Sequence, residues 1–148
     1  MSIILFCMAA IIILSTCGWA AAKNSGPRVY ASRAKGTVTR NSEPQPGMIV
    51  TRRVSSLGYD RVQKTRTDWD GVFRFPELTE RYDLTDFLPL PGEVRVDQTI
   101  QVENEDGSRS GIWTAHKRDF ERNSELGYPI KLLCDLGDGK CREEALAT

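Results

Sequence analysis

Short stretches of alternating apolar and polar residues recur along most of this chain, and turn-forming residues separate each stretch from the next. Such period-two runs predict β-strands with one buried face, because successive strand side chains point to opposite sides. Seven runs fit the pattern: Gly36 to Arg40, Met48 to Val54, Arg61 to Thr67, Val72 to Phe75, Glu93 to Glu103, Arg109 to His116 and Ile130 to Cys134. Seven short strands favour an all-β sandwich.

The segment from Thr65 to Phe75 carries the clearest hairpin signal. Asp68 and Asp70 can hydrogen-bond their own backbone in a turn, and Gly71 tolerates a positive φ. We therefore expect a strand, a tight acidic turn and a second strand. Trp69 lies between the two aspartates, and this position predicts an exposed side chain.

Two segments have mixed spacing that is typical of neither a clean strand nor a clean helix. The first, Leu78 to Leu88, predicts a short helix or a loop that covers one end of the sandwich. The second, Lys117 to Leu126, predicts one or two helical turns with Phe120 turned inward, ended by Gly127 and Pro129.

The N-terminal stretch from Ile3 to Ala22 has no charged residue, and its apolar core has the length of a signal peptide rather than of a membrane span. The stretch therefore predicts export. Three outcomes stay open: cleavage after the alanines that end at Ala22, lipidation of Cys17 in a lipobox-like sequence, or retention as an uncleaved anchor. Each outcome places the domain in the periplasm, either soluble or anchored to a membrane.

These patterns divide the chain into four parts. Residues 1–22 are a signal peptide, lipoprotein anchor or membrane anchor, and residues 23–35 are a basic tether. Residues 36–141 form one β-sandwich domain, and residues 142–148 are a flexible tail. A chain of 148 residues supports one such domain with a single core.

The charge balance changes along the chain although it is neutral overall. The whole chain carries 20 basic and 20 acidic residues, and this balance disfavours a nucleic-acid partner. Through Arg66 there are 10 basic and 2 acidic residues, and the remainder holds 10 and 18. Either strands from both parts interleave and neutralise each other, or distinct basic and acidic patches face a protein partner.

Cys134 and Cys141 are the only cysteines of the predicted domain, and a Gly-Asp-Gly turn lies between them. In an oxidising compartment this pair predicts a disulfide. Zinc is the weaker alternative, because two cysteines and the distant His116 do not supply four ligands. We expect no metal.

The sequence contains no recognisable catalytic motif. His116 is the only histidine, and Ser55, Ser56, Ser108 and Ser110 lie outside any nucleophile-elbow sequence. The Asp-x-Asp-Gly sequence at Asp68 could begin a calcium loop, but the terminal bidentate acid is missing. We therefore expect a turn rather than a calcium site, no cofactor and no enzymatic activity.

Protein binding is the remaining chemistry that the residues indicate. Trp69 stands near Arg66 and Arg74, with Asp70 beside it, and Trp and Arg are the residue types enriched in interface hot spots. These four residues are the partner-binding candidates, although Trp69 could instead cap an edge of its own sandwich. Trp113, in a strand-like run, is expected in the core.

Several separate blocks of sequence resemble known families when they are taken in order. The blocks Gly36-Thr37-Val38, Pro46 to Val50 and Thr67 to Phe75 resemble transthyretin-like (prealbumin-like), carboxypeptidase-regulatory-like modules. That resemblance implies a single seven-stranded, Ig-like sandwich.

Later blocks, which include Phe87-Leu88-Pro89, Gln98-Thr99-Ile100, Asn123 to Gly127 and Leu133 to Leu136, resemble short bacterial envelope proteins. Members of that group occur as immunity proteins beside type VI secretion effectors, phospholipase toxins included. The resemblance implies a noncatalytic periplasmic protein that binds and neutralises a toxin. The alternative function is that of a structural accessory module of the envelope that assembles through sheet edges. A third possible function is that of a small-ligand or carbohydrate-binding module.

Overall fold

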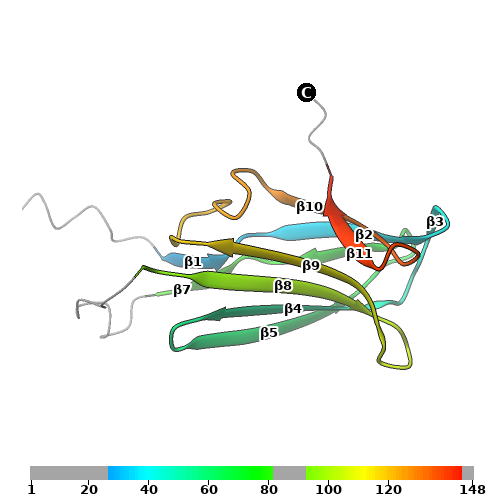
Figure 1. The fold of residues 1–148 in the computed structure, drawn as a ribbon, viewed down its shortest axis with the longest axis horizontal. Coiled ribbons are helices and arrows are strands. Elements are labelled where there is room, and N and C mark those ends of the chain that lie inside the picture. Colours follow the sequence, from blue (N-terminus) through cyan, green and yellow to red (C-terminus); the bar gives the residue numbers. More distant parts are fainter. Residues whose placement is uncertain (1–26, 82–92, 145–148) are drawn as a thin grey trace, which may run out of the picture.

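The computed structural model describes residues 27–81 and 93–144, and every regular element in these ranges is a β-strand (Figure 1). The expectation of an all-β protein is therefore confirmed. The strands are β1 (Arg28–Ala31), β2 (Ala34–Arg40), β3 (Glu43–Pro44), β4 (Ile49–Ser56), β5 (Tyr59–Arg66), β6 (Val72–Phe75), β7 (Leu78–Glu80), β8 (Val96–Glu103), β9 (Arg109–Lys117), β10 (Ile130–Asp135) and β11 (Lys140–Glu143).

The predicted count of seven strands is wrong, because the described ranges contain eleven. Each predicted run overlaps one of the strands β2, β4, β5, β6, β8, β9 and β10. The other four, β1, β3, β7 and β11, have two to four residues each and are too short to show an alternating pattern. They form because a neighbouring strand supplies the hydrogen bonds: β1 pairs with β7, β3 with β2, and β11 with β10.

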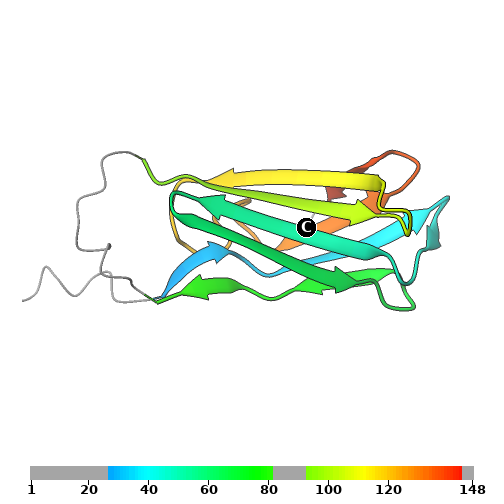
Figure 2. The same cartoon turned by 90° about the horizontal axis from the view of Figure 1, so that it is seen from below.

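Nine of the strands belong to one sheet in the order β3-β2-β10-β11-β9-β8-β4-β5, with β6 also paired to β2, while β1 and β7 form a second sheet. The sheets curl into a half-barrel (Figure 2). As a result, side chains of β2 and β10 meet those of β4 and β8 in the interior.

Two of the strand pairings are parallel and the others are antiparallel. β2 and β10 run parallel over six residue pairs, from Ala34 opposite Ile130 to Thr39 opposite Asp135. β11 joins β9 through one parallel pair. The longest antiparallel ladders join β5, β4, β8 and β9 in that order, so β5 forms a margin of the large sheet.

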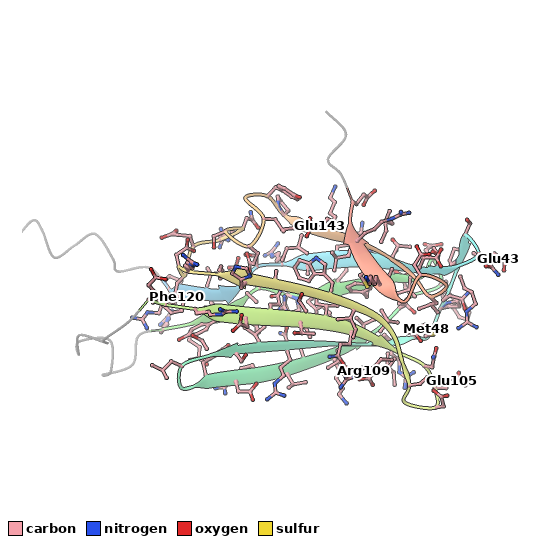
Figure 3. All side chains as sticks on the ribbon, viewed as in Figure 1. Glu43, Met48, Glu105, Arg109, Phe120 and Glu143 are labelled. Carbon is pink, nitrogen blue, oxygen red and sulfur yellow. A yellow bond between two sulfur atoms is a disulfide. The ribbon has the colours of Figure 1, made fainter. Side chains whose placement is uncertain are left out.

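Two apolar clusters fill the interior. The larger cluster consists of Ala34, Val38, Val50, Phe73, Phe75, Ile100, Val102, Trp113, Ile130, Leu132, Cys134 and Cys141. The smaller cluster consists of Ala31, Val54, Tyr59 and Val96. Met48 packs on the larger cluster and Phe120 on the smaller one, and Figure 3 labels these two residues toward opposite ends of the molecule. Trp113 is 5% exposed, which confirms its expected place in the core.

Two close contacts shape the larger cluster. Phe73 packs against the backbone of β2 at Gly36, where an added Cβ would lie 2.3 Å from a ring atom. Only glycine fits there, because no real Cβ tolerates that distance. Cys134 and Cys141 are direct cross-strand neighbours in β10 and β11, and the structure joins them in a disulfide.

The segment expected to be a basic tether is in part sheet. Within residues 23–35, β1 spans Arg28–Ala31 and β2 already begins at Ala34. The short sequence of β1 shows one buried alternation, Val29 and Ala31, which is too little to distinguish a strand from a tether. The signal or anchor segment, Cys17 and the end of the tail lie outside the described residues.

The helix expected over Lys117 to Leu126 is wrong. After β9 ends at Lys117 the chain makes turns, and Asn123 has a φ of 59°, which a right-handed helix does not allow. The physical reason lies in the interior, where Glu125 turns inward to bind Ser32. Of the other helical candidate, Leu78–Glu80 forms strand β7, and most of the remainder lies outside the described residues.

Candidate functional site

The acidic turn between β5 and β6 is held together by one carboxylate. Asp68 Oδ1 accepts hydrogen bonds from the backbone N–H groups of Asp70 at 3.0 Å and Val72 at 2.9 Å. Gly71 donates to the Asp68 carbonyl at 2.9 Å and has a φ of 73°. The prediction of an acidic turn is confirmed, and among the described residues no cluster of potential metal ligands is present.

The base of this turn is tied to the neighbouring loop. Thr67, which is 5% exposed, donates from Oγ1 to the carbonyl of Gln45 at 2.7 Å and accepts from the N–H of Met48 at 2.9 Å. Backbone hydrogen bonds also link Thr67 with Gly47 and Met48. The turn therefore stands on a fixed base rather than on a loose loop.

Trp69 projects from this base into solvent. Its side chain is 90% exposed, so it does not cap an edge of its own sheet. The exposure that the sequence predicted is confirmed. When another surface covers an exposed indole on a rigid turn, the side chain loses little conformational entropy and a large apolar area is removed from water.

The charged candidates lie in the same hairpin as Trp69 but differ in their contacts. Arg66 donates from Nη1 to the carbonyl of Gly47 at 3.0 Å, and Arg74 pairs with Asp68 across 3.2 Å. The side chain of Asp70 makes no hydrogen bond or ion pair with the described residues. The pKa of Asp68 is lowered, chiefly by the hydrogen bond from Val72 and further by Arg74.

A shallow pocket of about 240 Å³ lies beside Arg66. Its lining residues are Gly47, Met48, Ile49, Arg66, Glu103 and Glu105. Figure 3 labels Met48 and Glu105 near each other at the same end of the molecule. We call the four predicted residues Arg66, Trp69, Asp70 and Arg74, together with this pocket, the Trp69 surface.

Three polar residues lie in one cross-strand row on the outer face of the large sheet, because Ser55 of β4 is opposite Asp97 of β8 and Asp97 is opposite His116 of β9. Asp97 stands between the serine and the histidine and pairs with Arg95 at 3.0 Å. The exposed His116 side chain makes no hydrogen bond with the described residues, so the row contains no serine–histidine hydrogen bond. Ser110 is buried, and the Ser108 hydroxyl donates to Asp106 Oδ1 within the same turn at 2.6 Å.

No helix in the described ranges is long and apolar enough to cross a membrane.

Sequence reasoning missed a buried polar network between the two clusters. Arg52 is completely buried and donates to the carbonyl of Ser32 at 2.8 Å, to Gln63 Oε1 at 2.8 Å and to the carbonyl of Pro76. Burial lowers the pKa of Arg52 to about 10, against the opposing effect of Glu125. The guanidinium thereby bridges β4 and β5 to the segments before β2 and after β6.

The carboxylate of Glu125 anchors the second part of the network. It accepts from the N–H of Ser32 at 2.9 Å and from its hydroxyl at 2.7 Å. Lys117 Nζ lies 3.6 Å from Glu125, and these two side chains are 1% and 2% exposed. Burial lowers the pKa of Lys117, and Glu125 opposes that shift.

One signal in the sequence could have revealed part of this network. Arg52 alternates with Val50 and Val54, and all three side chains point inward. Gln98 likewise points inward from β8, but its side-chain amide has no hydrogen-bond partner among the described residues and lies outside the network. A polar residue at an inward position of a strand predicts a buried hydrogen-bonding site. Neither Ser32 nor Glu125 carried such a signal, because both lie outside regular strands.

Residues 34–139 match the model of a family described as a domain of unknown function, DUF6795. No curated protein and no solved structure matches.

Proposed function

This chain belongs to the DUF6795 family, and we propose that it is a noncatalytic protein-binding module that acts outside the cytoplasm. The observation that carries the proposal is Trp69, which is 90% exposed on a turn fixed by hydrogen bonds to Asp68 and Thr67. Binding through a preorganised aromatic side chain costs little conformational entropy. Tryptophan is also among the residues that dominate interface hot spots.

The charges of the Trp69 surface would select the partner. The indole would enter an apolar pocket of the partner, while Arg66 and Asp70 contribute polar contacts at the rim. Glu103 and Glu105 line the pocket beside Arg66, and they suit a basic side chain of the partner. Rim charges of this kind act mainly on the association rate and on specificity.

We further propose that the partner is a secreted toxin and that this protein is its immunity protein. The support for this narrower proposal is the resemblance to envelope proteins found beside type VI secretion effectors, together with the predicted export signal. The mechanism would be stoichiometric occlusion of a toxin that acts in the envelope, and phospholipase toxins are one such class.

We propose the transthyretin-like sandwich as the finer description of the fold. The support is the parallel pairing of β2 with β10 and the larger cluster, in which β2, β6 and β10 pack against β4, β8 and β9. The eleven strands are then the predicted seven with four short additions.

The test measures binding between the purified full-length protein and any secretion effector that is found encoded beside its gene. We expect Trp69→Ala to raise the Kd by about 30-fold or more, the range for a hot-spot residue. The matched control is Ile112→Ala, which truncates an apolar side chain that is 39% exposed on β9; we expect its Kd to match the wild type. Equal Kd values for both variants would contradict the role of Trp69, and a lack of any complex would contradict the immunity proposal.

A further inference from the structure

Among the strands of residues 27–81 and 93–144, strand β5 has a partner on one of its two edges only. It pairs with β4 along all eight of its residues and is the last strand in the order of the large sheet. Figure 1 shows it as the lower margin of the sheet. Asp60, Val62, Lys64 and Arg66 on this strand are all exposed. We propose that this edge pairs antiparallel with β5 of a second copy of the chain, across a two-fold axis at Val62.

Such pairing requires backbone N–H and C=O groups of Asp60, Val62 and Lys64 that point toward the free edge of β5. A two-residue turn, Leu57 and Gly58, connects β4 to β5, and Ser56 and Tyr59 close the hairpin. The closing pair of a two-residue hairpin is hydrogen-bonded, and hydrogen-bonded pairs then alternate along the ladder. Every second residue from Asp60 onward therefore directs its N–H and C=O away from β4, toward the free edge.

The side chains of these residues on one copy are complementary to the same residues on a second, antiparallel copy. With the axis at Val62, Asp60 faces Lys64 of the second copy, and this pair occurs twice. Val62, which is 55% exposed, meets its own copy on the axis. Lys64 has no ion pair with the described residues, and Asp60 is already held in place by Arg53 at 2.6 Å. Opposite charges directly across from each other stabilise an antiparallel pair.

The neighbouring register is less favourable. An axis at Gln63 would place each Val62 against Lys64 of the second copy, so the apolar pair would be lost. Charged side chains on an edge strand ordinarily prevent association, because identical edges repel each other. Here the acid and the base stand symmetrically about Val62, so antiparallel self-pairing neutralises them.

The dimer would present two Trp69 surfaces. The turn that carries Trp69 follows Arg66 at the end of β5, beyond the paired residues. Because the two copies of β5 run antiparallel, the two turns would lie at opposite ends of the joined strands. The inference does not rest on the proposed function, because the paired residues Asp60, Val62 and Lys64 are not part of the Trp69 surface.

Cysteine cross-linking tests the register in the full-length protein, with Cys7→Ser and Cys17→Ser in every sample. Two hydrogen-bonded residues that face each other lie about 5.5 Å apart between Cα atoms, within the range of a disulfide. We expect Val62→Cys to form a covalent dimer under mild oxidation. Arg66→Cys is the matched control, because its two copies would lie about 27 Å apart along the strands. Equal cross-linking of both variants, or of neither, would overturn the proposal.

Sedimentation velocity over a range of concentrations tests the charges. We expect Lys64→Glu to raise the dimer Kd roughly tenfold or more, and the double variant Asp60→Lys/Lys64→Glu to restore it in large part. Val62→Pro removes an N–H that faces the free edge and should give a monomer that stays folded, because Pro is tolerated on a free edge. Circular dichroism checks the fold of each variant. A wild-type monomer at concentrations up to about 1 mM, or a dimer that Lys64→Glu leaves unchanged, would refute the pairing.

Discussion

The larger cluster and the polar network around Arg52 and Glu125 are both shut off from solvent, but different forces hold them. In the larger cluster, apolar side chains such as Phe73, Ile100 and Leu132 pack together without directional requirements. In the network, Glu125 binds Ser32 and Lys117 through hydrogen bonds and charge. Apolar packing weakens by degrees when an atom is removed, whereas a buried charge that loses its partner is left with its full desolvation cost.

This difference teaches where the fold is tolerant and where it is specific. The network joins the segments next to β1 and β9 to β4 and β5, and it does so only when Ser32, Arg52 and Glu125 are all in place. A hydrophobic contact could form in several registers, but these hydrogen bonds form in one. The network therefore fixes how the strands are arranged, and the larger cluster supplies most of the apolar burial.

The largest effect is expected from Glu125→Ala, which removes the acceptor for Ser32 and leaves Lys117 buried without a counterion. We expect the free energy of unfolding, measured with urea, to fall by about 3–5 kcal/mol. Glu125→Gln should lose less, because its amide oxygen can still accept from Ser32. A matched control is Glu93→Ala, whose exposed ion pair with Arg118 contributes little. Equal losses for Glu93→Ala and Glu125→Ala would contradict the importance of burial.

The second effect concerns the disulfide of the larger cluster. Replacing Cys134 and Cys141 together by alanine should lower the free energy of unfolding by about 2–3 kcal/mol, because the unfolded chain regains the freedom of a short loop. The measurement is thermal or urea unfolding with and without a reducing agent. Reduction should lower the stability of the wild type toward that of the double variant and leave the variant unchanged. A response of the variant to the reducing agent would show that another cause is at work.

Gly36→Ala is expected to have the third largest effect. The new Cβ would lie 2.3 Å from the ring of Phe73, so either the ring or β2 must move. Forced overpacking of this kind costs about 1–3 kcal/mol. Gly111→Ala serves as the control, because its Cβ would have its nearest neighbour, Cys141 Sγ, at 3.4 Å. If both alanine variants unfold at the same urea concentration, the close packing of Phe73 on β2 is not what selects glycine.

The smallest effect is expected at the exposed turn, where Asp68 sets the pH dependence. Because the pKa of Asp68 is lower in the folded state than in the unfolded state, its contribution is complete above the unfolded pKa of about 4. That contribution is lost as the pH falls through the lowered folded pKa. Asp68→Asn should therefore flatten the acid limb of the stability curve and leave the slope near neutral pH unchanged. An unchanged acid limb in urea titrations between about pH 2 and pH 5 would argue against this role.

The sequence predicted the parts of the fold that depend on local patterns. The alternation in Glu93 to Glu103 and in Arg109 to His116 located β8 and β9. Asp68 and Gly71 located the turn that presents Trp69. These features need only neighbouring residues, so they can be read from a single chain. The partner-binding role of Trp69 stays a prediction.

The parts that the sequence did not predict depend on distant residues. Ser32 and Glu125 are 93 positions apart, and no local pattern connects them. Tertiary contacts likewise determine that Lys117 is buried and that the chain after it forms turns rather than a helix. Short strands such as β1 exist only because β7 lies beside them.

The parallel pairing of β2 with β10 also has a consequence for the order in which the chain folds. Ala34 lies opposite Ile130, so nearly the whole domain must be synthesised before this ladder can form. Contacts between residues so far apart in sequence carry a large loop-closure cost, which slows folding. Until β10 arrives, β2 lacks one of its neighbours, and the larger cluster lacks Ile130, Leu132 and Cys134. The nascent protein would therefore depend on protection from premature association during this interval.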